Sequence, residues 1–306
     1  MNPRTAHPAG LPRLLSIAGS DSSGGAGIQA DLKTFCAHGA YAMTAITAIT
    51  AQNTLGVTAV QALPPALVAA QIEAVFADPG VDAVKIGMLA EVGIIAAVAD
   101  SLRRSVVGRS LPIVLDPVMI AKSGDPLLDA DAVDHLQRLF PMATLVTPNL
   151  PEAERIGRAA GRSTATAKAA MAAMAATVEG RERLVRRLGD RCAAVLLKGG
   201  HAAGAAGEDL VDLLWDGSKV HAFVHPRIAS RSTHGTGCSL SSAIAARLGR
   251  GENLVQAVSG AIDWLHEAIA RAIPIGAGVG PVDHFWRQRR DAAGVEAGSP
   301  PGGCFA

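Results

Sequence analysis

The residues Gly235, Thr236, Gly237 and Cys238 are the first place where residue types and spacing could do chemistry. They stand where an alanine-rich helix is expected to begin. The first N–H groups of a helix have no partner inside it, and the helix dipole adds partial positive charge there. Small side chains let an anion approach these groups, so the segment predicts a phosphate-binding site. The alternative is a glycine-rich turn with Thr236 or Ser239 as an ordinary N-cap.

A second glycine-rich segment, AGSDSSGGAGIQADLK at residues 18–33, lies where a strand is expected to pass into a helix. A loop of glycine, serine and aspartate can wrap around a small polar ligand because little side-chain bulk stands in the way. The segment departs from the GxGxxG pattern of dinucleotide-binding folds, and the chain has no GxxxxGK(S/T) phosphate loop. A flexible turn without a ligand is the alternative interpretation.

Two shorter motifs add polar groups at the ends of expected strands. Asn149 and Glu152, in TPNLPEAE, could both face a hydrated magnesium ion, which takes few protein ligands and keeps several waters. Their alternative is an ordinary helix start with Asn149 as N-cap and Pro151 in the first turn. Lys198, in LLKGGH, could lie against a nucleotide, or it could be a solvated lysine in a tight turn.

These motifs lie on a chain in which strands and helices alternate. Apolar runs of strand length occur at 13–19, 43–53, 82–87, 111–117, 143–149 and 192–200, and helical patterns occur at 25–39, 65–78, 91–105, 129–139, from 151 and, mostly, over 163–188. Fully apolar strands that alternate with helices predict an α/β fold with a mostly parallel central sheet flanked by helices on both faces. Two antiparallel strands are expected around the turn Asp216-Gly217-Ser218, followed by helices near 236–249 and 253–272.

The expected sheet gives the polar residues one place to meet. Ligands of open α/β sheets bind beyond the carboxyl ends of the strands. The segments expected at those ends are Gly19–Gly27, Gln52, Gly87–Met88, Asp116–Lys122, Asn149 and Lys198. We therefore expect one site built from segments that are far apart in the sequence.

Composition restricts the function classes. Of 306 residues, 49% are hydrophobic and 18% are charged, which supports a buried core and argues against disorder. A net charge of +1 and only 3% aromatic residues argue against a nucleic-acid or membrane partner. The four cysteines form no CxxC pair, which argues against zinc and a disulfide framework and favours a reducing compartment. The run LLSIA is too short for a signal or membrane-spanning segment, so a cytoplasmic protein is expected.

Taken together, the motifs carry a resemblance to a known family. The stretch GSDSSGGAGIQADLKTFCAHGAYAMTAITAITAQNT, followed in order by KIGML, VLDPVMIAKSG, TPNLPEAE, LLKGGH and THGTGCSLSSAIA, resembles the hydroxymethylpyrimidine and hydroxymethylpyrimidine-phosphate kinases of thiamine biosynthesis. The resemblance runs from about residue 13 to about residue 272. It implies a ribokinase-like fold and a kinase that uses ATP and Mg2+. The implied substrates are 4-amino-5-hydroxymethyl-2-methylpyrimidine and then its monophosphate.

The resemblance also implies roles for individual residues. Gln52 matches the glutamine that hydrogen-bonds the aminopyrimidine, a task that suits an amide because it offers both a donor and an acceptor. The other matches lie around the pyrimidine (Gly19, Ala26, Met88 and Val118, with Asp31 near it), at magnesium (Asn149 and Glu152), at the nucleotide (Lys198 and Thr233) and at the catalytic anion hole (Gly235, Thr236, Gly237 and Cys238).

Cys238 bears on which kinase the resemblance implies. Sugar kinases of the superfamily mostly have GAGD at this place, with aspartate as a base, whereas GTGC matches the pyrimidine kinases and the cysteine-bearing pyridoxal kinases. A helix N-terminus lowers the pKa of a thiol and a nearby phosphate raises it. Phosphoryl transfer needs little help from a base, so Cys238 is expected to orient the hydroxymethyl group or to accept its proton late. A pyridoxal or pyridoxine kinase is one alternative, and a non-catalytic pyrimidine sensor with the same fold is another.

The domain organisation expected from the sequence is simple. Residues 1–12 are an N-terminal extension, residues 13–286 are one kinase domain, and residues 287–306 are a disordered tail. The segment 157–191 is longer than the resemblance leads us to expect, and it is expected to extend a helical excursion away from the site. No appended thiamine-phosphate synthase-like domain is expected at this length, and the family resemblance implies a homodimer.

Overall fold

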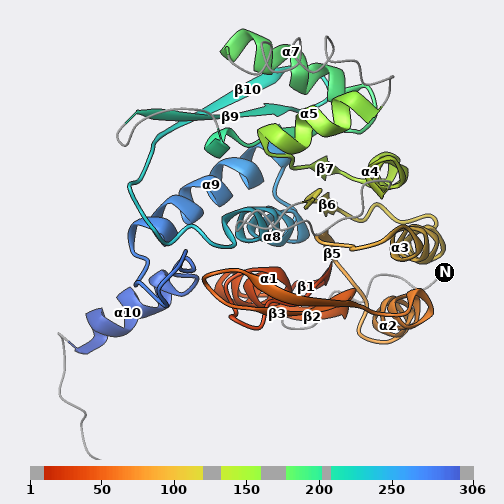
Figure 1. Ribbon diagram of the computed structural model, residues 1–306, viewed down its shortest axis with the longest axis horizontal. Coiled ribbons are helices and arrows are strands. Elements are labelled where there is room, and N and C mark those ends of the chain that lie inside the picture. Colours follow the sequence, from red (N-terminus) through yellow and green to blue (C-terminus); the bar gives the residue numbers. More distant parts are fainter. Residues whose placement is uncertain (1–9, 120–131, 160–176, 202–207, 297–306) are drawn as a thin grey trace, which may run out of the picture.

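The central feature of the computed structural model is one mixed sheet (Figure 1). The structure describes residues 10–119, 132–159, 177–201 and 208–296. The strand order is β10-β9-β8-β7-β6-β5-β1-β2. The strands are β1 (Arg13–Ala18), β2 (Tyr41–Ile46), β5 (Ala83–Ile86), β6 (Ile113–Leu115), β7 (Leu145–Val146), β8 (Val195–Leu197), β9 (Asp209–Trp215) and β10 (Val220–Pro226). Neighbours from β2 to β8 pair in parallel, whereas β8, β9 and β10 pair antiparallel. The predicted mostly parallel sheet is confirmed.

Helices cover both faces of this sheet (Figure 1). One face carries α2 (Pro65–Ala77), α3 (Val92–Ser105), α4 (Ala132–Leu136), α5 (Leu150–Ala159) and α7 (Val178–Gly189); the other carries α1 (Gly27–Ala37), α8 (Thr236–Gly249) and α9 (Leu254–Ala270). Successive side chains of a strand point to opposite faces. In β1, Leu15 and Ile17 therefore pack in the first layer and Leu14 in the second, and none of the three is exposed. The apolar strands need cover on both sides, as predicted.

The strand predicted at 43–53 is wrong as one unit. The chain leaves the main sheet after Ile46, and the second half becomes β3 (Ala48–Gln52), which pairs antiparallel with β4 (Val57–Ala62) in a separate two-stranded sheet. Thr47 marks the break: it is fully buried, and its Oγ1 donates a hydrogen bond of 2.6 Å to the Met88 carbonyl. An apolar, β-branched run has the same pattern in either sheet, so it could not reveal the change of partner.

Other element bounds also differ from the prediction. Residues 129–139 give the short helix α4 and the 3-10 helix η1 (Gln137–Met142), and the strand expected at 192–200 is only Val195–Leu197 before the 3-10 turn η2 (Gly199–His201). Of the tract 163–188, the structure describes α7, and the preceding residues lie outside the described ranges.

Part of the predicted C-terminal tail is helical. Residues Trp286–Glu296 form helix α10, which is anchored by Trp286, an indole only 7% exposed in the α8–α9 layer. The remaining residues of the predicted tail, 297–306, lie outside the described residues. Within the described ranges, no helix is both long and apolar enough to cross a membrane.

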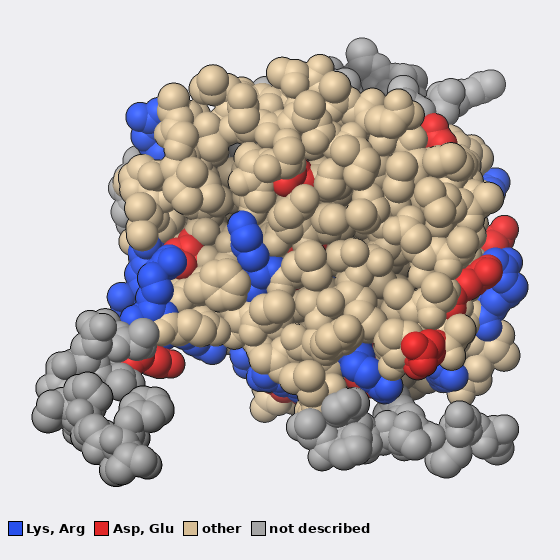
Figure 2. Space-filling model, turned by 90° about the horizontal axis from the view of Figure 1, so that it is seen from below, with Lys and Arg blue, Asp and Glu red and all other residues tan. Residues whose placement is uncertain are grey.

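One face of the molecule is poor in charge. In Figure 2, which looks at the molecule from below the view of Figure 1, charged side chains are sparse in the middle of the face and gather mainly toward its rim. Large apolar side chains are exposed on β2, β3, β4 and α2, the elements at the bottom of Figure 1: Tyr41 (54%), Ile49 (45%), Val60 (45%) and Leu67 (50%).

Candidate active site

A cleft of about 510 Å³ opens at the carboxyl ends of the parallel strands. Segments from nearly the whole described chain line it. They include residues 18–21, 26–27, 116, 118–119, 149, 151–152, 155, 225–228, 233–238 and 240, together with side chains such as Gln52, Lys85, Met88, Lys198, Leu265 and Ile269. Parallel strands direct their ends to one edge of the sheet, which is why segments so distant in sequence meet here.

The structure brings nearly all of the predicted site residues to this cleft. Those on its wall are Gly19, Ala26, Gln52, Met88, Val118, Asn149, Glu152, Lys198, Thr233, Gly235, Thr236, Gly237 and Cys238. Asp31 differs, because its side chain is fully buried beneath the cleft and does not line it.

The Asp31 carboxylate is one partner of a buried ion pair. Lys85 Nζ donates to both carboxylate oxygens of Asp31 at 2.8 Å, and Ser16 and Ser242 donate to the same carboxylate at 2.5 and 2.7 Å. Burial alone would lower the pKa of Lys85, but the charge of Asp31 raises it above its ordinary value. The pair ties β1, α1, β5 and α8 together under the cleft.

Helix α8 begins at the cleft with a glycine that its backbone requires. Gly235 is the N-cap at φ +74°, and a Cβ there would collide with the carbonyl oxygen of Gly25. No side chain caps the helix, so the alternative with Thr236 or Ser239 as N-cap is wrong. A Cβ on Gly237 would stand 3.4 Å from both Asp116 Oδ2 and Lys198 Nζ. The open N–H groups of the first turn therefore face a cation and a carboxylate across a narrow gap.

The Cys238 side chain lies in the same turn as a protonated thiol. Burial raises the pKa of Cys238 to about 11, and the charge of Lys85 only partly opposes this effect. The expected lowering of this pKa by the helix N-terminus does not prevail, because the cost of withdrawing a thiolate from water is larger. At neutral pH the side chain is thus a neutral donor and not an anion.

Three charged groups meet opposite the mouth of α8. Lys198 Nζ contacts Asp116 Oδ1 at 2.7 Å, and Thr147 Oγ1 donates to the same oxygen at 3.2 Å. Burial raises the pKa of Glu152 to about 7; Lys198 opposes this shift and the negative charge of Asp116 adds to it. Lys198 is thus bonded to Asp116, and the buried Glu152 carboxyl interacts electrostatically with both charges.

Asn149 and Glu152 also close the start of α5. The Glu152 N–H donates to Asn149 Oδ1 at 2.9 Å, and the Asn149 N–H donates to Glu152 Oε2 at 2.8 Å. This reciprocal capping satisfies two N–H groups that would otherwise lack partners. The helix-start alternative therefore describes the local geometry, while both side chains remain on the cleft wall. In the described part of the chain, no group of three or more His, Cys, Asp or Glu side chains is arranged to hold a metal ion.

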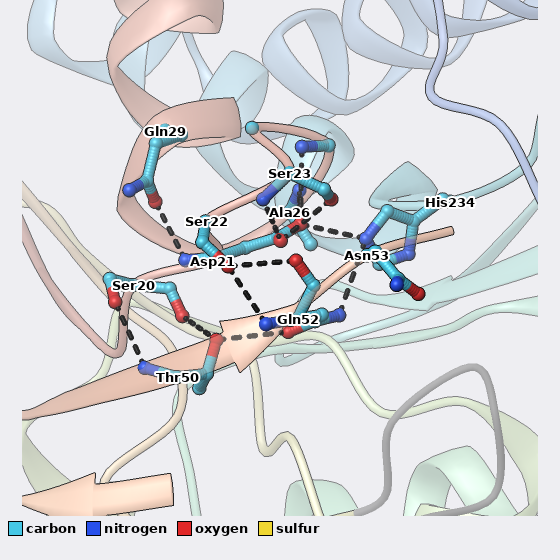
Figure 3. Close-up of polar contacts among 12 residues, drawn as sticks. Ser20, Asp21, Ser22, Ser23, Ala26, Gln29, Thr50, Gln52, Asn53 and His234 are labelled. Carbon is cyan, nitrogen blue, oxygen red and sulfur yellow. Dashed lines mark hydrogen bonds and ion pairs between the residues drawn. The ribbon is translucent and has the colours of Figure 1, made fainter. Parts of the chain in front are cut away.

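Sequence reasoning missed a polar network in the glycine-rich loop before α1, which Figure 3 shows. The Asp21 carboxylate accepts hydrogen bonds from the N–H groups of Ser23, Gly25 and Ala26 and lies 2.8 Å from His234 Nε2. Asp21 is 1% exposed and His234 6%. The only signal in the sequence is Asp21 in a serine- and glycine-rich turn, where such side chains commonly bond to the backbone two residues on.

The far end of the cleft also carries residues that the sequence did not single out. His225 Nε2 lies 3.3 Å from Asp212 Oδ2, and the His225 and His266 rings are 5.6 Å apart. Asp212 Oδ1 in turn accepts a hydrogen bond of 2.5 Å from the Gly199 N–H, one residue after Lys198. These side chains come from β9, β10 and α9, whose mutual placement cannot be read from sequence spacing.

Comparison with known proteins gives consistent relatives. A family model described as phosphomethylpyrimidine kinase matches residues 21–283. A hydroxymethylpyrimidine/phosphomethylpyrimidine kinase from Rhizobium meliloti is 51% identical and covers 90% of this chain and 98% of its own length. The Escherichia coli protein of the same name is 47% identical, with 89% and 96% covered. A thiamine biosynthesis bifunctional protein ThiED from Geobacter sulfurreducens is 47% identical over 93% of this chain, which spans only 54% of that longer protein.

Solved structures agree on the fold. Pyridoxal kinase from Staphylococcus aureus in complex with AMP-PCP aligns with a TM-score of 0.77 at 31% identity, covering 91% of this chain and 95% of that one. Phosphomethylpyrimidine kinase from Clostridium difficile aligns with a TM-score of 0.68 at 40% identity, covering 84% and 99%. The ribokinase-like fold expected from the sequence is confirmed by these neighbours.

Proposed function

Because the chain belongs to the phosphomethylpyrimidine kinase family and is a phosphotransferase, we propose that its cleft phosphorylates 4-amino-5-hydroxymethyl-2-methylpyrimidine and then the resulting monophosphate. One observation carries this proposal: an amide suited to reading an aminopyrimidine, Gln52, and an uncapped helix mouth suited to phosphate line the same cleft. The test is a panel of hydroxymethyl heteroaromatics with ATP and magnesium, with products resolved by mass. A diphosphate formed from the pyrimidine is expected, and its absence would contradict the two-step proposal.

The pyrimidine is proposed to lie between Gln52 and an apolar wall formed by Gly19, Ala26, Met88 and Val118. Gly19 keeps this wall flat, because a Cβ there would approach Met88 Sδ to 2.9 Å. Gln52 would then bond to the polar edge of the ring, and the wall would contact its faces. The hydroxymethyl arm would point toward Cys238, which belongs to the same lining.

The transferred phosphoryl group is proposed to lie at the first turn of α8. Backbone N–H groups of residues 235–238 would donate to its oxygens, and the helix dipole would favour its negative charge. Groups positioned before the reaction stabilise charge more cheaply than groups that must reorganise. Because the thiol is protonated at neutral pH, Cys238 would donate a hydrogen bond rather than act as a base.

ATP is proposed to enter from the Lys198 side of the cleft. Lys198 and Thr233 line it there, and the lysine is held by Asp116 at 2.7 Å so that its charge is fixed in place. Relatives in this fold class include kinases solved with an ATP analogue and with ADP, which supports ATP as the phosphoryl donor.

Magnesium is proposed to be held near Glu152 and Asn149, with Asp116 beside them. The donor chemistry fits: these are hard oxygens, few in number, as Mg2+ prefers. Crowding with Asp116 helps raise the pKa of Glu152, and a divalent cation would relieve that repulsion. When bound, magnesium would neutralise charge on the ATP phosphates. The chain itself holds Asp116 through Lys198 and Glu152 through the capping of α5.

A pyridoxal kinase is the second candidate. The observation in its favour is the higher TM-score of 0.77 to pyridoxal kinase, against 0.68 to the pyrimidine kinase structure. Sequence identity points the other way, at 31% against 40%. A direct comparison of kcat/KM for the two substrates decides between them. The non-catalytic sensor has no support, since the curated relatives are named as kinases.

For the assembly, we propose a homodimer formed through the charge-poor face of β2, β3, β4 and α2. Exposed Tyr41, Ile49, Val60 and Leu67 support it, because large apolar side chains left in water on neighbouring elements favour burial against a partner. Light scattering should give twice the chain mass, and Ile49→Lys with Val60→Lys should give a monomer. Val107→Lys, at a residue 78% exposed outside this face, is the control and should leave the mass unchanged. A monomeric wild type would contradict the proposal. A cytoplasmic location stays a prediction.

A further inference from the structure

We propose that Asp21 holds His234 in the form that carries hydrogen on Nε2, and that this keeps the side-chain amide of Gln52 free to bond to the pyrimidine. Asp21 and His234 would thus be positioning residues for substrate recognition. The inference rests on the proposed function in one respect, the role of Gln52. The three side chains lie together in Figure 3, and they come from the loop before α1, the end of β3 and the residue before the N-cap of α8.

The Asp21 carboxyl group has a lowered pKa. Burial disfavours its charge, but hydrogen bonds from His234 and Ser23 outweigh that effect and lower the pKa of Asp21 to about 2. At neutral pH the carboxylate is therefore ionised and can only accept hydrogen bonds. Since Asp21 Oδ2 lies 2.8 Å from His234 Nε2, that nitrogen must carry the hydrogen of this contact.

The position of the hydrogen on His234 decides whether the Gln52 amide N–H groups have a partner there. Gln52 Nε2 lies 3.4 Å from the same His234 Nε2. Once that nitrogen donates to Asp21, it has no lone pair to offer, so it cannot accept a hydrogen bond from the Gln52 amide. The amide N–H groups therefore gain nothing from the histidine, and an amide turned to bring Oε1 to the same place would meet Nε2–H only at the long distance of 3.4 Å, against 2.8 Å to Asp21.

The side-chain oxygen of Gln52, Oε1, is also largely available to a ligand. Thr50 Oγ1 lies 3.3 Å from Gln52 Oε1, but its single hydrogen has a closer acceptor in the Ser20 carbonyl at 2.9 Å. The residue is held instead by its backbone: Gln52 N–H donates to Ser22 Oγ at 2.8 Å, and Ser22 Oγ donates to the Gln52 carbonyl at 2.7 Å. The glutamine is therefore fixed in place without using its side-chain amide.

The surroundings of His234 hold its ring in place. A Cβ on Gly25 would collide with His234 Cδ2, so the ring packs directly against the glycine loop. The His234 N–H donates to the Gly280 carbonyl at 2.9 Å, which fixes the backbone of the residue. With the ring held in place, loss of Asp21 removes the acceptor of the Nε2 hydrogen, and the neighbouring Gln52 amide N–H then favours the form of His234 that carries its hydrogen on Nδ1. A His234 Nε2 with a free lone pair would then accept from Gln52 and compete with the substrate.

The direct test reads the state of His234 by 15N NMR of the histidine-labelled protein, with the resonance assigned by difference against His234→Asn. In the wild type we expect hydrogen on Nε2. In Asp21→Ala we expect a larger share of unprotonated Nε2 than in the wild type, because the acceptor that holds the hydrogen there is gone. An unprotonated Nε2 in the wild type overturns the proposal, and this measurement needs no variant of Asp21 that folds.

The kinetic test uses Asp21→Ala with and without Gln52→Ala. Alone, Asp21→Ala should raise the KM for the pyrimidine roughly tenfold, the ratio that corresponds to one neutral hydrogen bond, with the KM for ATP unchanged. In the Gln52→Ala background it should add less than about twofold, because the amide it acts through is gone. An equal rise in both backgrounds would mean that Asp21 only supports its loop, and would overturn the proposal.

A matched control separates the histidine from the loop. Ser23→Ala removes a 2.7 Å hydrogen bond to Asp21 Oδ1 but leaves the oxygen that faces His234. Its pyrimidine KM should stay near wild type, and a tenfold rise would contradict the proposal. Failure of the proposed function is distinguishable: if Gln52→Ala alone leaves the pyrimidine KM unchanged, the role of Gln52 is wrong, while the NMR result still tests the histidine.

Discussion

Gln52 is the residue on which substrate recognition depends in the proposed mechanism. We expect Gln52→Ala to raise the KM for the pyrimidine, because an aromatic ring donor left without its partner costs on the order of 1–3 kcal/mol. The KM for ATP should stay near wild type, since Gln52 lies at the end of β3 and Lys198 at the end of β8. Steady-state kinetics with each substrate varied in turn checks this, and a normal pyrimidine KM would remove Gln52 from the site.

Substitutions at Gly237 and Cys238 distinguish the role of the backbone N–H groups from that of the thiol at the start of α8. Gly237→Val would place methyl groups in the gap toward Asp116 and Lys198, where the phosphoryl group is proposed to lie. It should lower kcat by roughly 10²–10³-fold, as the loss of an oxyanion donor does. Cys238→Ser keeps a small neutral donor and should retain substantial activity.

Gly237→Ala is the control for the first variant, because its Cβ would make only ordinary contacts at 3.4 Å. Circular dichroism confirms folding of all three proteins. An inactive Cys238→Ser beside an active Gly237→Val would assign the chemistry to the thiol instead of the backbone.

At the scale of elements, the start of α5 places a titrating carboxylate in the cleft. Because the pKa of Glu152 is raised to about 7, the folded protein keeps its proton at pH values where the unfolded chain has lost it. Between the ordinary pKa of a glutamate and about 7, stability should therefore fall as the pH rises. Magnesium needs the ionised form, so the concentration for half-maximal rate should fall as the pH rises through about 7. Glu152→Gln should raise that concentration and remove its pH dependence; an unchanged dependence would leave Glu152 as a helix cap alone.

The buried pair Lys85–Asp31 joins four elements, and its loss should be visible in stability. Lys85→Met would leave the Asp31 carboxylate buried without its cation, which costs on the order of 3–5 kcal/mol. Adding Asp31→Asn should restore part of this, since a neutral amide can still bond to Ser16 and Ser242. Urea unfolding measures both variants. A single variant with wild-type stability would show that water reaches the pair.

At the scale of the whole molecule, the sequence was informative about topology and poor at detail. Alternating apolar strands and helices predicted the parallel sheet, and the strand ends predicted where Gln52, Asn149 and Lys198 would meet. Three features of the structure could not be predicted from the sequence. The burial of Asp31 with Lys85 and the contact of Asp21 with His234 join residues 54 and 213 positions apart, which local patterns do not encode. The paired residues of β3 and β4 are only 5 to 14 positions apart, but an apolar, β-branched run has the same pattern in this sheet as in the main one.

The distribution of the cleft along the chain has a consequence during synthesis on the ribosome. Its lining begins at Ala18 and ends at Ile269, and the mouth of α8 is among the last parts to be made. A nascent chain that has emerged as far as β6 can already pair β1, β2 and β5, yet it has no helix mouth to hold phosphate. Because the lining contributed by β8, β9, β10, α8 and α9 is absent from such a chain, we expect it to be inactive as a kinase however well its first strands pair.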